Sequence, residues 1–172
     1  MKRLIIGAGA FLLTGLVLAA TPLLDYINER GVVSYNLHED ASRALASRKD
    51  FEEVTVANTI TFDECGTTYI LNSATEFAST LPAPEMGCSF RFIVKAAPVG
   101  AAYTVVTSGG SNLIDGSLTV DGAAVPCVDE DTVTFTASAA VSGDQIEVYS
   151  DGTSWFVQGV GEAATALACS AT

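Results

Sequence analysis

Hydrophobic and polar positions divide the chain into three parts. Leu4 to Leu24 contains no charged residue and follows a Lys2-Arg3 pair. From Val54 onward, short runs that alternate apolar and polar residues are separated by turn-forming residues. Such alternation is typical of half-buried strands. The pattern predicts a hydrophobic anchor segment over residues 1–24, a helical connector over 25–53 and a β display domain over 54–172.

The alternation is clearest from Ser89 to Lys95, where Phe90, Phe92 and Val94 fall on one face. Val54, Val56 and Ile60 open the β domain. Six further runs follow the same pattern: Thr67 to Asn72, Tyr103 to Thr107, Ser117 to Val120, Thr132 to Ala137, Gln145 to Ser150 and Ser154 to Gln158. Short runs separated by Gly, Pro, Asn and Asp indicate an all-β architecture. The sequence therefore predicts an antiparallel β-sandwich or jelly-roll-like domain.

Two local signals refine this expectation. Asp151-Gly152 lies between two alternating runs, which predicts a hairpin with Ile146, Val148, Trp155 and Val157 on its core side. The run Leu81-Pro-Ala-Pro84 predicts an extended connection rather than a central strand.

The connector carries a helix signal. Asn36 followed three residues later by Glu39 is a capping-box pattern. Leu37, Ala41, Ala44 and Leu45 follow at helical spacing, and the predicted helix ends between Ser47 and Asp50. This helix would pack on the β domain or form a stalk that contacts a sister subunit.

The segment Leu4–Leu24 has two interpretations. As a signal peptide, it would be cleaved after the small-residue motif Val17-x-Ala19. As a retained helix, it would extend about 31 Å, which matches one bilayer core. We expect retention, either in a membrane or among neighbouring subunits, where Gly15 and Ala19 allow close helix approach. Lys2 and Arg3 would hold the N-terminus in the cytoplasm and send the β domain across the membrane.

Charge limits the classes of partner. The net charge is −12, and no basic residue follows Lys95. An acidic surface repels phosphate backbones, so we expect no nucleic-acid partner.

Four cysteines, Cys65, Cys88, Cys127 and Cys169, are spaced too widely for a typical zinc site. Their even number allows two disulfides, with three possible connectivities. The compartment decides between disulfides and free thiols. We expect buried free thiols, because Cys65 and Cys88 lie at predicted strand edges, where a small apolar side chain fits.

Catalytic and metal-binding signals are weak. His38 is the only histidine, and no Gly-x-Ser-x-Gly motif accompanies it. Asp129-Glu130-Asp131 could supply oxygen ligands to calcium but is predicted to be an acidic turn tip. Asp63 and Glu64 are expected to cap or solvate a turn. Trp155 and Tyr149 could form a sugar platform, although the alternation places Trp155 in the core and Tyr149 on the surface. The sequence predicts no catalytic, cofactor or metal site, and a protein that is not an enzyme.

A resemblance adds to this interpretation. Three stretches carry it: Glu64 to Phe77 with Thr80 to Pro84, Phe92 to Pro98 with Tyr103 to Val106, and Asn112 to Gly116 with the run Asp151-Gly-Thr-Ser-Trp-Phe-Val-Gln-Gly159. Together they resemble a β-module of bacteriophage structural proteins, over roughly residues 55–160. The resemblance implies a display or decoration unit of a head or fibre, without catalytic residues. The apolar segment departs from that pattern and implies attachment to a membrane-containing virion or through a hydrophobic arm.

We therefore expect a phage virion structural protein, a capsid decoration, spike or membrane-associated subunit. Its partners would be copies of itself, other capsid or filament subunits, and membrane lipid through Leu4–Leu24. The alternative is an exported bacterial surface or pilus-like filament subunit, located at the cell surface. An enzyme such as a glycan hydrolase ranks third, because a cleft with paired carboxylates would be needed.

Overall fold

The structure is a computed structural model that describes residues 50–73, 75 and 77–171. The predicted segment Leu4–Leu24, the predicted connector helix and His38 lie outside the described residues. Among the described residues, no helix has the length and apolar character needed to cross a bilayer.

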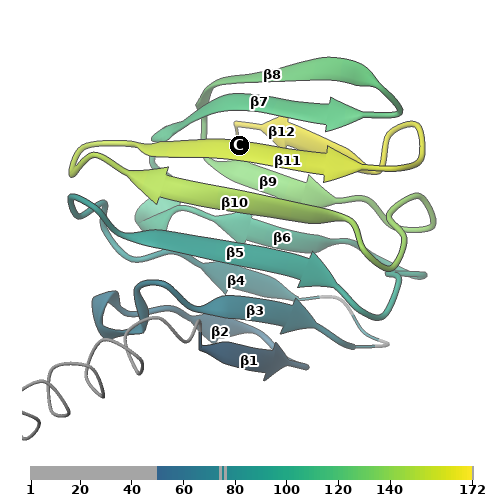
Figure 1. The fold of residues 1–172 in the computed structure, drawn as a ribbon, viewed down its shortest axis with the longest axis horizontal. Helices are drawn as coiled ribbons and strands as arrows, with labels where there is room; N and C mark the ends of the chain where they lie inside the picture. The colour runs from purple at the N-terminus through teal and green to yellow at the C-terminus, as the bar shows by residue number, and fades with distance from the viewer. Residues whose placement is uncertain (1–49, 74, 76, 172) are drawn as a thin grey trace, which may run out of the picture. The chain divides into compact units, whose positions relative to one another are not determined.

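The described chain is mainly β and forms two sheets, as expected (Figure 1). The seven-stranded sheet contains, in spatial order, β1 (Phe51–Val54), β3 (Thr68–Leu71), β5 (Ser89–Val94), β10 (Gln145–Ser150), β11 (Trp155–Gly161), β7 (Ile114–Val120) and β8 (Ala123–Glu130). The five-stranded sheet contains β12 (Leu167–Ser170), β9 (Thr132–Phe135), β6 (Tyr103–Val106), β4 (Ala78–Thr80) and β2 (Asn58–Thr59). Two short 3-10 turns, η1 (Phe62–Glu64) and η2 (Ser108–Gly110), lie between strands.

Strand directions correct the prediction of an antiparallel sandwich. The first six strands alternate between the two sheets, and β1, β3 and β5 run parallel to one another, as do β2, β4 and β6. β11 and β7 are also parallel, whereas the β5–β10, β10–β11, β7–β8, β6–β9 and β9–β12 pairs are antiparallel. Alternation along a strand shows which face is buried but not which neighbour the strand joins. Residues 51–106 therefore wind back and forth between the two sheets in parallel turns, which no local pattern specified.

Strand bounds also differ from expectation. The β body begins at Phe51, within the range expected for the connector. β2, β4, β8 and β12 were not predicted. These strands are short or lack clear alternation, and β8 contains Pro126, which edge strands tolerate.

The core lies between the sheets and contains the predicted apolar face of β5. Phe90, Phe92 and Val94 are buried, and the ring of Phe92 stacks on Tyr69 with centroids 5.3 Å apart. From the other sheet, Tyr103, Val105 and Phe135 are buried in the same core cluster. Aromatic side chains thus supply much of the apolar area that holds the two sheets together.

The predicted hairpin is confirmed, with a longer loop than the Asp-Gly signal suggested. Ser150 pairs with Trp155, so Asp151 to Ser154 form the connection between β10 and β11. Oδ1 of Asp151 accepts hydrogen bonds from the backbone N–H groups of Thr153 (2.8 Å) and Ser154 (2.9 Å). Val148 lies opposite Val157, and both are buried. The loop is therefore organised by the carboxylate of Asp151 as well as by the left-handed backbone of Gly152.

All four cysteines form disulfides, so the expectation of free thiols is wrong. Cys65, which precedes β3, bonds to Cys88, which precedes β5, and their Cα atoms are 5.2 Å apart. Cys127 of β8 bonds to Cys169 of β12, with a Cα–Cα distance of 5.5 Å. The second bond joins an edge of one sheet to an edge of the other. Sequence spacing did not show that these edges meet.

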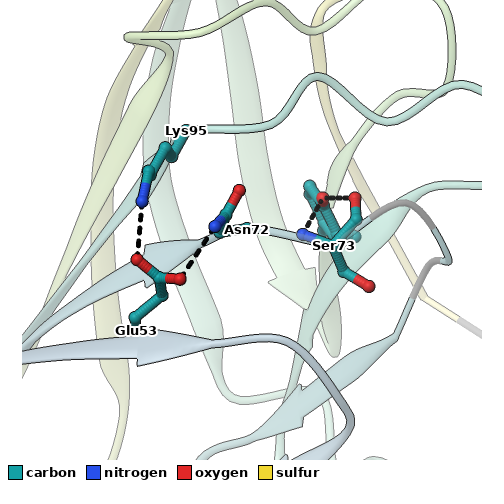
Figure 2. Close-up of polar contacts among 5 residues, drawn as sticks. Glu53, Asn72, Ser73 and Lys95 are labelled. Atoms are coloured by element: carbon teal, nitrogen blue, oxygen red, sulfur yellow. Dashed lines mark hydrogen bonds and ion pairs between the residues drawn. The ribbon is translucent and has the colours of Figure 1, made fainter.

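The opposite edge of the seven-stranded sheet is held by polar contacts (Figure 2). Nζ of Lys95 lies 2.6 Å from Oε2 of Glu53, and Nδ2 of Asn72 donates to Oε1 of Glu53 over 2.8 Å. The Lys95 hydrogen bond, followed by that of Asn72, holds the pKa of Glu53 below its usual value. Both ionic side chains are about half exposed, so the pair contributes little stability. Its effect is to join β1 to the segments that follow β3 and β5.

Candidate functional site: the outer face of the seven-stranded sheet

The candidate site lies on the outer face of β5, β10, β11 and β7. These strands belong to the seven-stranded sheet, which is nearer the viewer in Figure 1. Inward residues of these strands fill the core, so the alternate positions face outward. Arg91, Glu147 and Gln158 form one outward row across three strands. Tyr149 and Phe156 are paired in the neighbouring row. The face thus combines charged, amide and aromatic groups.

Hydrogen bonds between side chains organise this face. Nε of Arg91 donates to Oε1 of Gln145 over 3.1 Å, and the Nη2 atom donates to the same oxygen. Nε2 of Gln158 donates to the hydroxyl of Tyr149 over 2.9 Å. Desolvation, followed by a hydrogen bond with Glu147, raises the pKa of Tyr149 above its usual value. These bonds restrict the side-chain rotamers before any ligand arrives.

A shallow hollow of about 480 Å³ lies over these strands. The polar side chains around it are Arg91, Ser117, Thr119, Gln145, Glu147 and Gln158. This volume is within the range of small-molecule sites, although the hollow is open to solvent. The arrangement offers hydrogen-bond donors and acceptors to a bound molecule.

The predicted roles of Trp155 and Tyr149 are confirmed. Trp155 is fully buried, with its ring centroid 5.7 Å from that of Phe90. Tyr149 is 39% exposed. The two residues point to opposite faces of the sheet, so they cannot form a joint sugar platform. Phe156, which sequence reasoning did not single out, is the exposed aromatic residue paired with Tyr149. Because Phe156 directly follows the buried Trp155 in a strand, alternation could have indicated that Phe156 is exposed.

The Asp63-Glu64 pair forms a turn, as predicted for these residues. Oε2 of Glu64 accepts hydrogen bonds from the backbone N–H and the hydroxyl of Thr61, both over 2.6 Å. Oε1 of Glu64 accepts from the hydroxyl of Tyr69 over 3.1 Å. The Thr61 side chain is the main cause that lowers the pKa of Glu64, while burial raises the pKa of Tyr69. A carboxylate held in this way caps η1.

The acidic run Asp129-Glu130-Asp131 is not the exposed turn tip that was expected. Asp131 is buried, and its Oδ1 accepts a hydrogen bond of 2.6 Å from the hydroxyl of Thr132. Asp129 has a left-handed backbone, and its N–H donates to Oδ1 of Asp115. Among the described residues, no group of histidine, cysteine or carboxylate side chains has a geometry that could hold a metal ion.

Asp144 is a structural residue that sequence reasoning missed. It is buried, and its two carboxylate oxygens accept hydrogen bonds of 2.9 Å from the backbone N–H groups of Val141 and Glu162. Asp144 therefore joins the turn before β10 to the end of β11. Its place in a Ser-Gly-Asp turn gave a signal for local structure but none for this long-range contact.

Comparison with known proteins gives no relative from which a function could be transferred. No family model, no curated protein and no solved structure matches this chain.

Proposed function

We propose that this chain is a structural display protein that is anchored by Leu4–Leu24 and presents its β body on the surface of a virion or a bacterial cell. The pairing of all four cysteines is the observation that carries this proposal. Disulfides persist in oxidising compartments, such as the periplasm and the surfaces of cells and virions. A body that matures there must leave the reducing cytoplasm.

The disulfides also bear on the choice between a virion and a bacterial cell as the surface that displays the β body. Lys2 and Arg3 before the apolar segment favour transfer of the β body across a membrane. Together with the disulfides, this orientation favours an exported surface or filament subunit, or a subunit of a virion that acquires its proteins at a membrane. A capsid decoration protein that assembles entirely in the cytoplasm fits less well.

The chemistry of the body supports a structural role. Its carboxylates Glu64, Asp131 and Asp144 accept hydrogen bonds from turns and strands. The expected partners remain copies of this chain, neighbouring capsid or filament subunits and lipid around Leu4–Leu24. No nucleic-acid partner is part of the proposal, because the strongly acidic body repels phosphate backbones.

Co-sedimentation of three forms with purified particles, filaments and membranes would test this function. The forms are the full chain, a chain that lacks residues 1–49, and a control whose residues 4–24 are replaced by an unrelated apolar helix of the same length. We expect the full chain and the control to sediment with a membrane-containing fraction, and the truncated form to remain in the supernatant. Removing the apolar segment costs several kcal/mol of anchoring.

Two outcomes would contradict the proposal. Full occupancy of the truncated chain in the sedimented fraction would make the apolar segment dispensable for attachment. Recovery of the intact chain only as a soluble cytoplasmic protein with reduced thiols would exclude display in an oxidising compartment.

Quantitative mass spectrometry of the sedimented fraction would distinguish a many-copy structural subunit of virions from a filament made of one protein.

A further inference from the structure

We propose that the outer face of the seven-stranded sheet binds a neutral oligosaccharide in the hollow between β5, β10, β11 and β7. This inference adds a ligand site to the proposed display role. It holds whether the protein is displayed on a virion or on a bacterial cell. Amide groups in the hollow have unused hydrogen-bonding capacity, exposed aromatic rings lie in the neighbouring row, and the body is acidic.

The two glutamines retain capacity for a ligand. Gln145 uses its Oε1 atom to accept from Arg91, and Gln158 uses its Nε2 atom to donate to Tyr149. Within the described part of the chain, these bonds leave the Nε2 donors of Gln145 and the Oε1 acceptor of Gln158 available. Both side chains line the hollow. Sugar hydroxyls donate and accept hydrogen bonds, so donors and acceptors side by side suit them.

Aromatic rings stand beside these polar groups. Tyr149 and Phe156 are directly paired across β10 and β11, and they are 39% and 44% exposed. The hydroxyl of Tyr149 accepts a hydrogen bond from Gln158, which lines the hollow. A sugar ring presents an apolar C–H face surrounded by hydroxyls, which matches an aromatic surface next to amide and hydroxyl groups. A purely apolar ligand would leave the amide groups without partners.

Charge favours a neutral ligand over an anionic one. Residues 50–172 contain Arg91 and Lys95 as their only basic side chains, against sixteen acidic ones. Lys95 is paired with Glu53, and Arg91 lies beside Glu147 in the register of β5 and β10. The surrounding field repels anionic polymers. The open hollow buries little of a ligand, so we expect dissociation constants on the order of 1 mM.

The test uses the full chain in a detergent that has no sugar headgroup. Saturation-transfer NMR would follow maltohexaose, chitohexaose and a mannose hexasaccharide as neutral probes, and a heparin-derived hexasaccharide as the anionic probe. We expect saturable binding of at least one neutral probe and weaker binding of the heparin fragment. Tyr149→Ala and Gln158→Ala should each weaken that binding by about tenfold.

Matched controls separate a ligand site from general damage to the surface. Phe62→Ala removes another exposed aromatic ring, and Glu85→Ala another exposed polar side chain, both outside the hollow. These variants should bind as the unchanged chain does. Tyr149→Phe keeps the ring and removes only the hydroxyl, with its hydrogen bonds to Gln158 and Glu147, so it should weaken binding less than Tyr149→Ala. Melting curves would show that each variant is folded.

Three results would overturn the inference. The first is the absence of binding by any neutral probe at 10 mM, about ten times the expected constant. The second is binding that Tyr149→Ala and Gln158→Ala leave unchanged. The third is a face that joins two copies of the chain, seen as self-association abolished by the same substitutions without sugar binding. None of these three results bears on whether the full chain co-sediments with particles, filaments or membranes. The display role is therefore tested separately from the ligand site.

Discussion

At the scale of single residues, Trp155 is the side chain on which the core depends most clearly. It is the largest of the fully buried side chains and contacts Phe90. Trp155→Ala should lower the free energy of unfolding by about 3–5 kcal/mol, because a large cavity would remain. Denaturant unfolding of the full chain, with its disulfides intact, would measure this loss.

Phe156→Ala is the control, because Phe156 follows Trp155 on the exposed face. It should change the unfolding free energy by less than about 1 kcal/mol. Trp155→Phe should cost less than Trp155→Ala, since the buried Nε1 has no hydrogen-bond partner among the described residues. Equal losses for Trp155→Ala and Phe156→Ala would show that Trp155 is not a core residue.

Gly116 illustrates a backbone requirement at the same scale. Its φ is +143°, and a Cβ atom there would lie 2.0 Å from the carbonyl oxygen of Val157. Gly116→Ala should therefore destabilise the protein by more than about 2 kcal/mol, because β7 and β11 would have to separate. Gly109→Ala is the matched control, with φ +74° and open space around its Cβ position. Its cost should be about 1–2 kcal/mol. Thermal melting of both variants would detect the difference, and a smaller loss for Gly116→Ala would contradict the close approach.

At the scale of elements, the β10–β11 hairpin depends on the ionised Asp151. Hydrogen bonds from the backbone of Ser154, and then from Thr153, lower the pKa of Asp151 below its usual value. A lowered folded-state pKa means that this stabilisation is complete above the unfolded-state pKa and is lost as the pH falls through the folded-state value. Asp151→Ala should therefore lower the melting midpoint at pH 6.

Asp151→Asn provides the titration control, because its amide oxygen can still accept hydrogen bonds but does not ionise. The midpoint difference between the unchanged chain and Asp151→Asn should shrink as the pH falls from 6 to 2.5. Comparison of the two proteins cancels the titration of Glu53 and Glu64, whose pKa values are also lowered. A pH-independent difference would show that the charge of Asp151 does not stabilise the loop.

At the scale of the whole molecule, the two disulfides hold distant parts of the chain together. The cysteines that they join are 23 and 42 residues apart in the sequence. In the chain-entropy account, each bond should contribute about 3–4 kcal/mol by restricting the unfolded chain. Reduction of both disulfides should lower the melting midpoint strongly. The Cys127→Ala/Cys169→Ala double variant should lose at least as much free energy of unfolding as the Cys65→Ala/Cys88→Ala double variant.

Alkylation of the denatured, unreduced protein measures the pairing directly. No cysteine should be labelled before reduction, and all four should be labelled after it. Mass spectrometry of peptides would then identify the Cys65–Cys88 and Cys127–Cys169 connections. Labelling of all four thiols before reduction would contradict the pairing and the proposal of display in an oxidising compartment.

The local features of the β body could be predicted from the amino-acid sequence. The buried face of Ser89–Val94, the hairpin around Asp151-Gly152, the burial of Trp155 and the exposure of Tyr149 all follow from alternation and turn chemistry. These properties depend on residues that are close in sequence, and a period of two assigns each side chain to one face. The sequence also indicated a mainly β fold, because the strand runs are short and regularly interrupted.

The way in which those strands join depends on tertiary packing and could not be predicted from the sequence. The parallel winding of β1 to β6 and the contact of Cys127 with Cys169 link residues far apart in sequence. The burial of Asp144, the pairing of Tyr149 with Phe156 and the hollow beside them depend on the register of neighbouring strands. Register is set by the packing of both sheets together, and a single strand's pattern is compatible with several partners. For that reason the sequence indicated the faces of the sheets, while the packed sheets placed the disulfides and the candidate site.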